Sequence, residues 1–206
     1  MAAFCRDEGG SVLIPVAPKP EPASFNAKVR TPGQAFLASV PTPSAKQFKK
    51  KQFWKAALPY MKTAYNSVCA YSSFWMPGNC SVDHFHPKSA RPDLAYEWTN
   101  YRLAHDKINI NKADSTDVLD PFTIQADWFV LDVATLWVRP EPALQATLKT
   151  AVQKTIDVLK LNEDQWVQMR FAIFTSYLNK ELALSYLQRT YPFIAAEIQR
   201  QGIQPK

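Results

Sequence analysis

The densest set of side chains able to catalyse a reaction lies between residues 83 and 112. Asp83 and His84 are adjacent, Asn100 and Asn109 follow at a spacing of nine, and Lys112 closes the set three residues later. Hydrolysis of a phosphodiester needs a base that activates water, and a neutral histidine serves that purpose near pH 7. It also needs a cation to offset phosphate charge, and aspartate and asparagine oxygens hold hard divalent ions. The set therefore has the residue types for metal-assisted phosphodiester hydrolysis.

The backbone around Asp83 and His84 decides how these two side chains cooperate. On an extended strand, neighbouring side chains point to opposite faces, whereas on a turning segment they can converge. The sequence leaves both geometries open. A site with few protein ligands leaves positions on the ion for water and for a substrate phosphate.

The order and spacing of these residues resemble the HNH endonucleases, in which a hairpin and a helix form a ββα-metal finger around one divalent ion. The matching positions are Asp83-His84-x-x-Pro87, then Trp98-x-Asn100, then Asn109-x-x-Lys112. The resemblance implies that His84 is the general base and that Asp83 and Asn109 hold Mg²⁺ or Mn²⁺. It implies that Asn100 holds the loop bearing His84, and that Lys112 lies near the substrate phosphate or braces the helix.

A second, more scattered resemblance concerns residues 155–162 and Arg170. They look like the helical tail of a subgroup that includes the HNH subunit of Septu-type anti-phage systems, which also occur beside retrons. In such systems the nuclease accompanies an ABC-type ATPase. The two resemblances together cover about residues 60–175. They imply a defence nuclease gated by an ATPase partner, with DNA as the usual substrate and RNA, including transfer RNA, as the alternative.

One departure from the family concerns a structural zinc site that many relatives build from two Cys-x-x-Cys pairs. Here the first pair is Cys69 and Ser72, and the second would fall at His105 and Ile108. A structural zinc takes four nitrogen or sulfur ligands, which this set does not supply. We therefore expect no structural zinc, although Cys80 could join Cys69 and His105 as an alternative metal group. Apolar packing is expected instead, around Phe74, Trp75 and Ile108.

The chain carries a net charge of +6, which attracts polyanions such as nucleic acids. Lysines crowd the segment after Ser44, and basic side chains flank the motif. Each is either a phosphate contact or a solvated surface residue, and the sequence does not separate the two; His86 could also be a second base. The candidate nucleic-acid contacts are His86, Lys88, Arg91, Lys49, Lys50 and Lys51.

The fold predicted around this motif is mainly α-helical with a small ββα-metal finger, and thus α+β overall. Residues 1–43 hold seven of the 16 prolines and predict an extended arm, which straps the core, is a disordered tail or orders on a partner protein. Residues 44–139 form the predicted nuclease core with a preceding basic helix. Residues 140–206 form a helical region.

Helix boundaries follow from capping residues and apolar spacing. Ser44 is predicted to cap a helix that Pro59 kinks or divides. Residues 118–138 are expected to form either short strands or an irregular segment that covers the core. Pro142 is expected near a helix start, and Asn162 is expected to cap the next helix. A further short helix is expected over 181–200, broken by Pro192. Trp98 is predicted to lie in the core and His105 to be packed or capping.

The composition of the chain indicates the cellular compartment in which the protein is expected. The three cysteines are too few and uneven for a disulfide scaffold. Asp7 and Glu8 interrupt the stretch where a signal peptide needs apolar residues. No apolar run approaches the ~20 residues of a membrane helix. We expect a cytoplasmic protein without a membrane segment.

Two other function classes remain. The chain could be a non-catalytic subunit that uses an HNH-like shell to bind nucleic acid or an ATPase, or a basic RNA-binding protein without metal dependence. The intact set of Asp83, His84, Asn100 and Asn109 argues against both. Because a free nuclease is toxic, we expect a partner to restrain it, with the proline-rich arm and the C-terminal helices as the contact surfaces.

Overall fold

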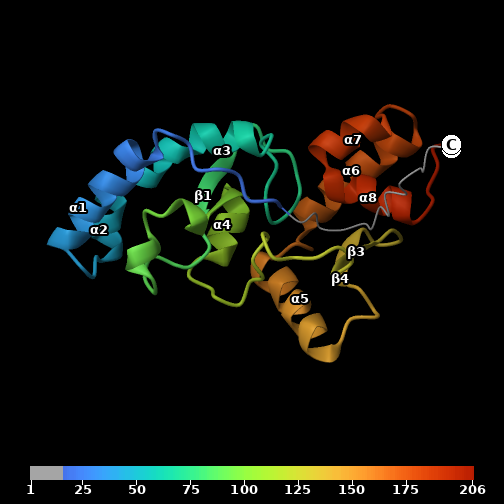
Figure 1. The fold of residues 1–206 in the computed structure, drawn as a ribbon. Helices are drawn as coiled ribbons and strands as arrows, with labels where there is room; N and C mark the ends of the chain where they lie inside the picture. Colours follow the sequence, from blue (N-terminus) through green and yellow to red (C-terminus); the bar gives the residue numbers. More distant parts are fainter. Residues whose placement is uncertain (1–15) are drawn as a thin grey trace, which may run out of the picture.

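The computed structural model describes residues 16–206, which form an α+β fold, about half helical, with two small antiparallel two-stranded sheets (Figure 1). The segments up to α4 occupy one side of the molecule, and α6, α7 and α8 occupy the other. The β3–β4 sheet lies between α5 and these last helices. No helix within residues 16–206 is long and apolar enough to span a membrane.

The described part of the N-terminal arm begins as an extended strap. Over residues 16–22 the chain has no regular secondary structure, and its carbonyls serve as anchors. The Lys19 carbonyl accepts from Trp98 Nε1, and the Pro20 carbonyl accepts from the Tyr60 hydroxyl. The strap predicted from the prolines is thus present over this stretch, while residues 1–15 of the predicted arm lie outside the described residues.

The prediction of an extended arm is wrong over residues 26–39. A helical turn, η1 (Asn26–Arg30), continues into α1 (Thr31–Ser39). Pro32 lies in the first turn of α1, where a missing N–H removes no helical hydrogen bond. A Cβ on Gly33 would lie 2.1 Å from the Tyr96 ring, so glycine allows α1 to contact the core here.

The basic segment folds as three short helices. They are α2 (Ala45–Lys50), η2 (Phe53–Ala57) and α3 (Leu58–Ala64). Ser44 caps α2 as predicted, in a capping box with Gln47. The expected division near Pro59 is present, because the turn η2 ends at Ala57 and α3 begins at Leu58. The chain leaves helical geometry at Lys51 and Gln52, and Pro59 lies in the first turn of α3, where proline is tolerated.

The motif residues lie on a strand–strand–helix unit. Strands β1 (Cys80–His84) and β2 (Tyr101–His105) pair antiparallel, with Asp83 opposite Arg102, and α4 (Asp106–Lys112) follows at once. Between the strands run the short turns η3 (Pro92–Leu94) and η4 (Trp98–Asn100). His105 caps α4 by accepting from the Lys107 backbone N–H, in the capping role predicted for it.

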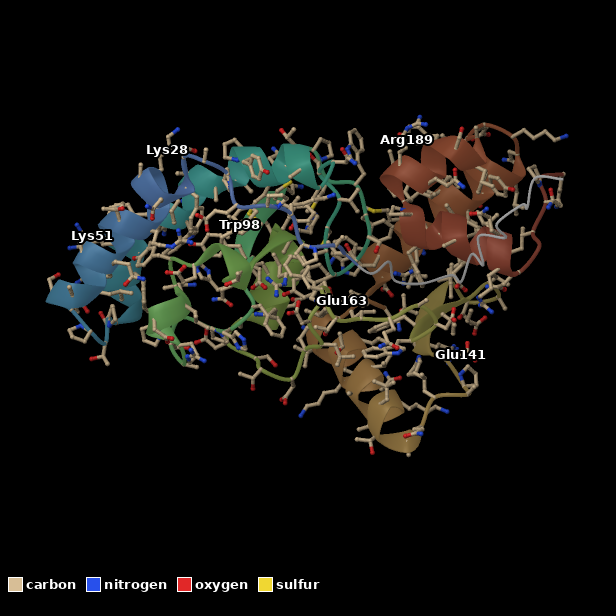
Figure 2. All side chains as sticks on the ribbon, viewed as in Figure 1. Lys28, Lys51, Trp98, Glu141, Glu163 and Arg189 are labelled. Carbon is tan, nitrogen blue, oxygen red and sulfur yellow. The ribbon has the colours of Figure 1, made fainter. Side chains whose placement is uncertain are left out.

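The predicted core position of Trp98 is confirmed. The side chain is 8% exposed and its ring packs edge-on against Phe25 and Tyr101. Figure 2 shows it in the interior, whereas Lys28 and Lys51 project from the outer surface of the N-terminal helices. This aromatic cluster fixes α3 and the strap over the β1–β2 hairpin.

The C-terminal half contains the second sheet and four helices. Strands β3 (Phe129–Asp132) and β4 (Trp137–Pro140) form the short strands expected over 118–138. The helices are α5 (Ala146–Leu159), α6 (Asp164–Leu178), α7 (Leu184–Thr190) and α8 (Pro192–Arg200). The chain does break at Pro192, which starts α8. The helix expected near Pro142 begins later, at Ala146.

The predicted cap at Asn162 is wrong, because Glu163 holds the N-cap position of α6. The Asn162 side chain instead accepts from the Val138 N–H and donates to the Val138 carbonyl. The sheet has two strands, so no further strand pairs with the outer edge of β4. The Asn162 side chain bonds the backbone N–H and carbonyl of Val138 in place of such a strand. A sheet edge needs such partners as much as a helix terminus does.

The apolar packing expected around Cys69 is present at Phe74 and Ile108. Cys69 Sγ accepts the backbone N–H groups of Ser72 and His105, and Ile108 is fully buried. Phe74 is buried and stacks on Trp166. The prediction is wrong for Trp75, whose side chain is 40% exposed, although its backbone N–H donates to the Thr190 carbonyl of α7.

Candidate active site

Helix α4 lies along β1 in a regular register. Asn109 Nδ2 donates to Ser81 Oγ at 3.0 Å and approaches the Val82 carbonyl at 3.5 Å. One turn later, Lys112 Nζ donates to Asp83 Oδ1 at 3.2 Å and to the His84 carbonyl at 2.9 Å. Because residues three apart share a helix face, Asn109 and Lys112 together fasten α4 to the strand.

Asp83 is buried on the α4 side of the strand. It is 2% exposed, and each carboxylate oxygen has a donor, Lys112 Nζ on Oδ1 and the Tyr71 hydroxyl on Oδ2 at 2.5 Å. Burial raises the pKa of Tyr71 well above its ordinary value, and the Asp83 carboxylate raises it further, so the hydroxyl remains a donor. The side chain of Asp83 thus lies in a polar cluster closed off from solvent.

His84 lies on the opposite face of β1, as an extended strand requires. Its ring is 4% exposed, and Nε2 is 2.8 Å from the Ala95 carbonyl oxygen. A carbonyl only accepts, so Nε2 carries the hydrogen and the lone pair of a neutral ring lies at Nδ1. The Lys88 ammonium lies 3.4 Å from Nδ1. The Trp54 ring packs edge-on against the imidazole at 4.9 Å.

The surroundings of His84 favour its neutral form. Burial lowers the pKa of His84 well below its ordinary value of 6.5, and the positive charges of Lys88 and Lys112 lower it further. Burial also lowers the pKa of Lys88. A neutral histidine with one nitrogen held by a carbonyl and the other presenting a lone pair has the state required of a general base.

Asn100 holds the loop that follows His84. Its Oδ1 accepts the His86 N–H at 2.8 Å, while Nδ2 donates to the carbonyls of His86 and Leu94 at 3.0 and 3.1 Å. The Asn100 carbonyl also accepts the Phe85 N–H. These bonds fix both ends of the loop, including the stretch that presents the Ala95 carbonyl to His84.

Asp83 and Asn109 match a divalent cation in donor type. Both offer oxygen ligands of the kind that Mg²⁺ and Mn²⁺ take. Asn109 uses only its amide nitrogen within residues 16–206, which leaves Oδ1 for an ion. At Asp83 an ion meets the Lys112 ammonium as a competing cation. No cluster of three or more His, Cys, Asp or Glu side chains within residues 16–206 is arranged to hold a metal, so the proposed pair depends on further ligands from water and substrate.

Two hollows lie beside Trp54 and Lys88, the side chains that contact the buried His84 ring, while His84 itself lines neither. One, of about 310 Å³, lies over α2, and the other, of about 530 Å³, lies between η2 and α4. Gln52, Trp54 and Lys88 line both, so the hollows meet at Lys88. Asn109 lines the second hollow, whereas Asp83 and Lys112 line neither.

The other predicted nucleic-acid contacts are spread more widely. Lys49 lines the first hollow, while Lys50 and Lys51 are exposed and line neither. His86 is exposed beside Phe85. Arg91 is exposed and its guanidinium pairs with Asp93, which leaves less charge for a phosphate.

Three groups of this site were missed by sequence reasoning. Trp54 and Tyr71 lie outside the motif of residues 83–112, and the Ala95 carbonyl belongs to the backbone. For Tyr71 the sequence offers one signal, its place between Cys69 and Ser72, where the zinc pattern of the family is interrupted. The sequence offers no signal for the Ala95 carbonyl, since every residue type has a backbone carbonyl.

Comparison with known proteins adds no assignment to this geometry. No family model matches the chain, and no curated protein matches it. The resemblance to HNH endonucleases therefore depends on the motif residues and on the strand–strand–helix unit that carries them.

Proposed function

We propose that the chain is an HNH-type endonuclease that hydrolyses phosphodiester bonds of nucleic acid with a divalent cation. The observation that supports it most is the state of His84. Burial lowers the pKa of His84 and so favours the neutral ring, Nε2 is bound to the Ala95 carbonyl, and the lone pair of Nδ1 faces the Lys88 ammonium at the junction of the hollows. A binding module does not require such a lone pair, whereas a general base does.

In this proposal each polar residue of the unit has a distinct task. His84 Nδ1 takes the proton of the attacking water, and the Ala95 carbonyl keeps the ring in the tautomer that allows it. Asn100 holds the loop that carries Ala95 and His86. Lys112 braces α4 against β1 rather than reaching substrate, because its side chain is fully buried.

Asp83 and Asn109 are the residues proposed to hold Mg²⁺ or Mn²⁺. When bound, such an ion offsets negative charge on the phosphate and on the departing oxygen. Burial around Asp83 keeps the carboxylate in place, and the Tyr71 hydroxyl orients it.

The proposed biological setting is antiviral defence, as in the Septu-type and retron-associated systems that the motif resembles. DNA is the favoured substrate, with RNA as the alternative, and an ABC-type ATPase is the proposed partner. The basic residues near the hollows support a polyanionic substrate but do not distinguish DNA from RNA.

The test is cleavage of supercoiled plasmid and of total RNA by the purified chain, in Mg²⁺, in Mn²⁺ and in EDTA. We expect metal-dependent cutting of one substrate by the wild-type chain. Cutting is lost in His84→Ala and retained in Lys180→Met, which alters an exposed residue at the turn after α6. Equal cutting by His84→Ala and wild type would reject the assigned base.

A wild-type chain that binds nucleic acid without cutting it would favour the alternative, a non-catalytic subunit with an HNH-like shell. The same assay with the ATPase partner added separates the two. Cutting that appears only with the partner identifies a gated nuclease, and binding without cutting in its presence identifies a binding subunit.

A further inference from the structure

Lys88 is a partly buried cation without an anionic partner in the described structure. Its ammonium lies 3.4 Å from His84 Nδ1 and 5.1 Å from the centre of the Trp54 ring. Within residues 16–206 no carboxylate lies within salt-bridge distance of it, in contrast to Lys112, which is paired with Asp83. Asp83 and Asp114 act on Lys88 only from beyond ion-pair distance, and a partly desolvated cation without a direct ion pair gains much from an incoming anion.

The position of Lys88 coincides with the opening of the site. It is one of three residues shared by the two hollows, and it is the only charged one among the three. Lys49 lines the first hollow and Lys55 the second. Asp114 also lines the first hollow and Asp106 the second, so both hollows carry charges of both signs, and Lys88 is the charged residue that they share.

We infer that Lys88 is the residue that receives the scissile phosphate, with the nucleic-acid strand continuing into the hollows on either side. This inference rests on the proposed nuclease function. A phosphate bound to the ammonium lies next to His84 Nδ1, because the two nitrogens are 3.4 Å apart. Water between that phosphate and Nδ1 is then placed for attack. The flexible lysine stem lets the ammonium turn from the imidazole to the phosphate.

The first experiment measures binding without cleavage. A fluorescein-labelled 20-base-pair duplex and its single strand are titrated in EDTA over a range of salt concentrations, by fluorescence anisotropy. Lys88→Met removes the charge, and Lys180→Met, at an exposed turn after α6, is the matched control. We expect the slope of log K against log salt for the duplex to fall by about 0.9 in Lys88→Met alone, with binding about eightfold weaker near 0.1 M salt. Equal slopes for the two variants would overturn the inference.

The second experiment separates a phosphate contact from a structural role. In single-turnover cleavage, Lys88→Met is expected to raise the half-saturating enzyme concentration and to lower the maximal rate, and Lys88→Arg is expected to restore binding. An unchanged thermal midpoint in Lys88→Met shows that folding is retained. A lowered midpoint with unaltered binding and rate would assign Lys88 a purely structural role and overturn the inference.

The two proposals fail in distinguishable ways. A Lys88-dependent salt slope in a chain that never cleaves would retain the phosphate site and reject the nuclease. His84-dependent cleavage with no change in Lys88→Met would retain the nuclease and reject the phosphate site.

Discussion

The Lys112 ammonium lies 3.2 Å from the Asp83 carboxylate, with side chains 0% and 2% exposed, at the point where α4 meets β1. The Tyr71 hydroxyl occupies the second oxygen of the same carboxylate. A buried pair of this kind is costly to break from one side, since the remaining charge has no solvent to stabilise it. The pair therefore joins the helix that carries Asn109 to the strand that carries His84.

Removing one partner of this pair should destabilise the chain more than removing both. We expect Asp83→Ala to lower the free energy of unfolding by about 3–5 kcal/mol, because Lys112 is left buried and unpaired. The double variant Asp83→Ala with Lys112→Met should recover part of that loss. Urea unfolding followed by tryptophan fluorescence measures both. A double variant no more stable than Asp83→Ala would show that the ion pair does not account for the loss.

Lys112 should also compete with a divalent ion for Asp83. Lys112→Met removes the nearby positive charge, so we expect the Kd for Mn²⁺ to fall by about tenfold, equivalent to about 1.4 kcal/mol. Titration calorimetry with Mn²⁺ alone measures this, and Asp83→Asn serves as the control in which binding is lost. Weaker Mn²⁺ binding by Lys112→Met would contradict this competition.

The stability of the chain should depend on pH through His84. Above pH 6.5 the ring is neutral both folded and unfolded, and it contributes no pH dependence. Below pH 6.5 the unfolded chain takes up a proton that the folded chain does not, because burial lowers the pKa of His84. The free energy of unfolding should then fall by about 1.4 kcal/mol per pH unit from this group.

The comparison that isolates this effect uses His84→Gln and His86→Gln. Between pH 7 and pH 5, we expect His84→Gln to lose less stability than the wild-type chain and His86→Gln to follow the wild type. Carboxylates contribute equally in all three proteins. Parallel stability curves for wild type and His84→Gln would contradict the proposed burial of a neutral ring.

Asn100 should matter through the loop rather than through contact with substrate. Asn100→Ala removes hydrogen bonds to the His86 N–H and to the His86 and Leu94 carbonyls, and should lower the free energy of unfolding by about 1–3 kcal/mol. Asn100→Asp keeps the acceptor but loses both donated bonds, so it should also be destabilised. Stability of Asn100→Asp equal to wild type would remove the assigned role of the donated bonds.

The sequence predicted local structure correctly where the spacing of residues and the chemistry of their side chains indicate the same element. The motif residues predicted a strand–strand–helix unit, and β1, β2 and α4 form one. Ser44 predicted its helix because a hydroxyl three residues before Gln47 satisfies helix N–H groups locally. The catalytic assignments themselves remain predictions, since they depend on a reaction rather than on the fold.

The errors arose where tertiary contacts decide local structure. Proline content predicted an extended arm, but Pro32 lies in the first turn of α1, where its ring is compatible with a helix. Asn162 has the side chain of a helix cap, yet the edge of β4 takes its hydrogen bonds. The tautomer of His84 depends on the Ala95 carbonyl, which only the folded loop brings to Nε2.

The most direct test of the account is the single-turnover cleavage rate of His84→Ala, with and without added imidazole. We predict that the substitution removes cleavage, that imidazole partly restores it by entering the space beside Trp54, and that Lys180→Met cleaves as the wild type does. Cleavage by His84→Ala at the wild-type rate, in protein free of wild-type chain, would contradict the assignment of His84 as the base.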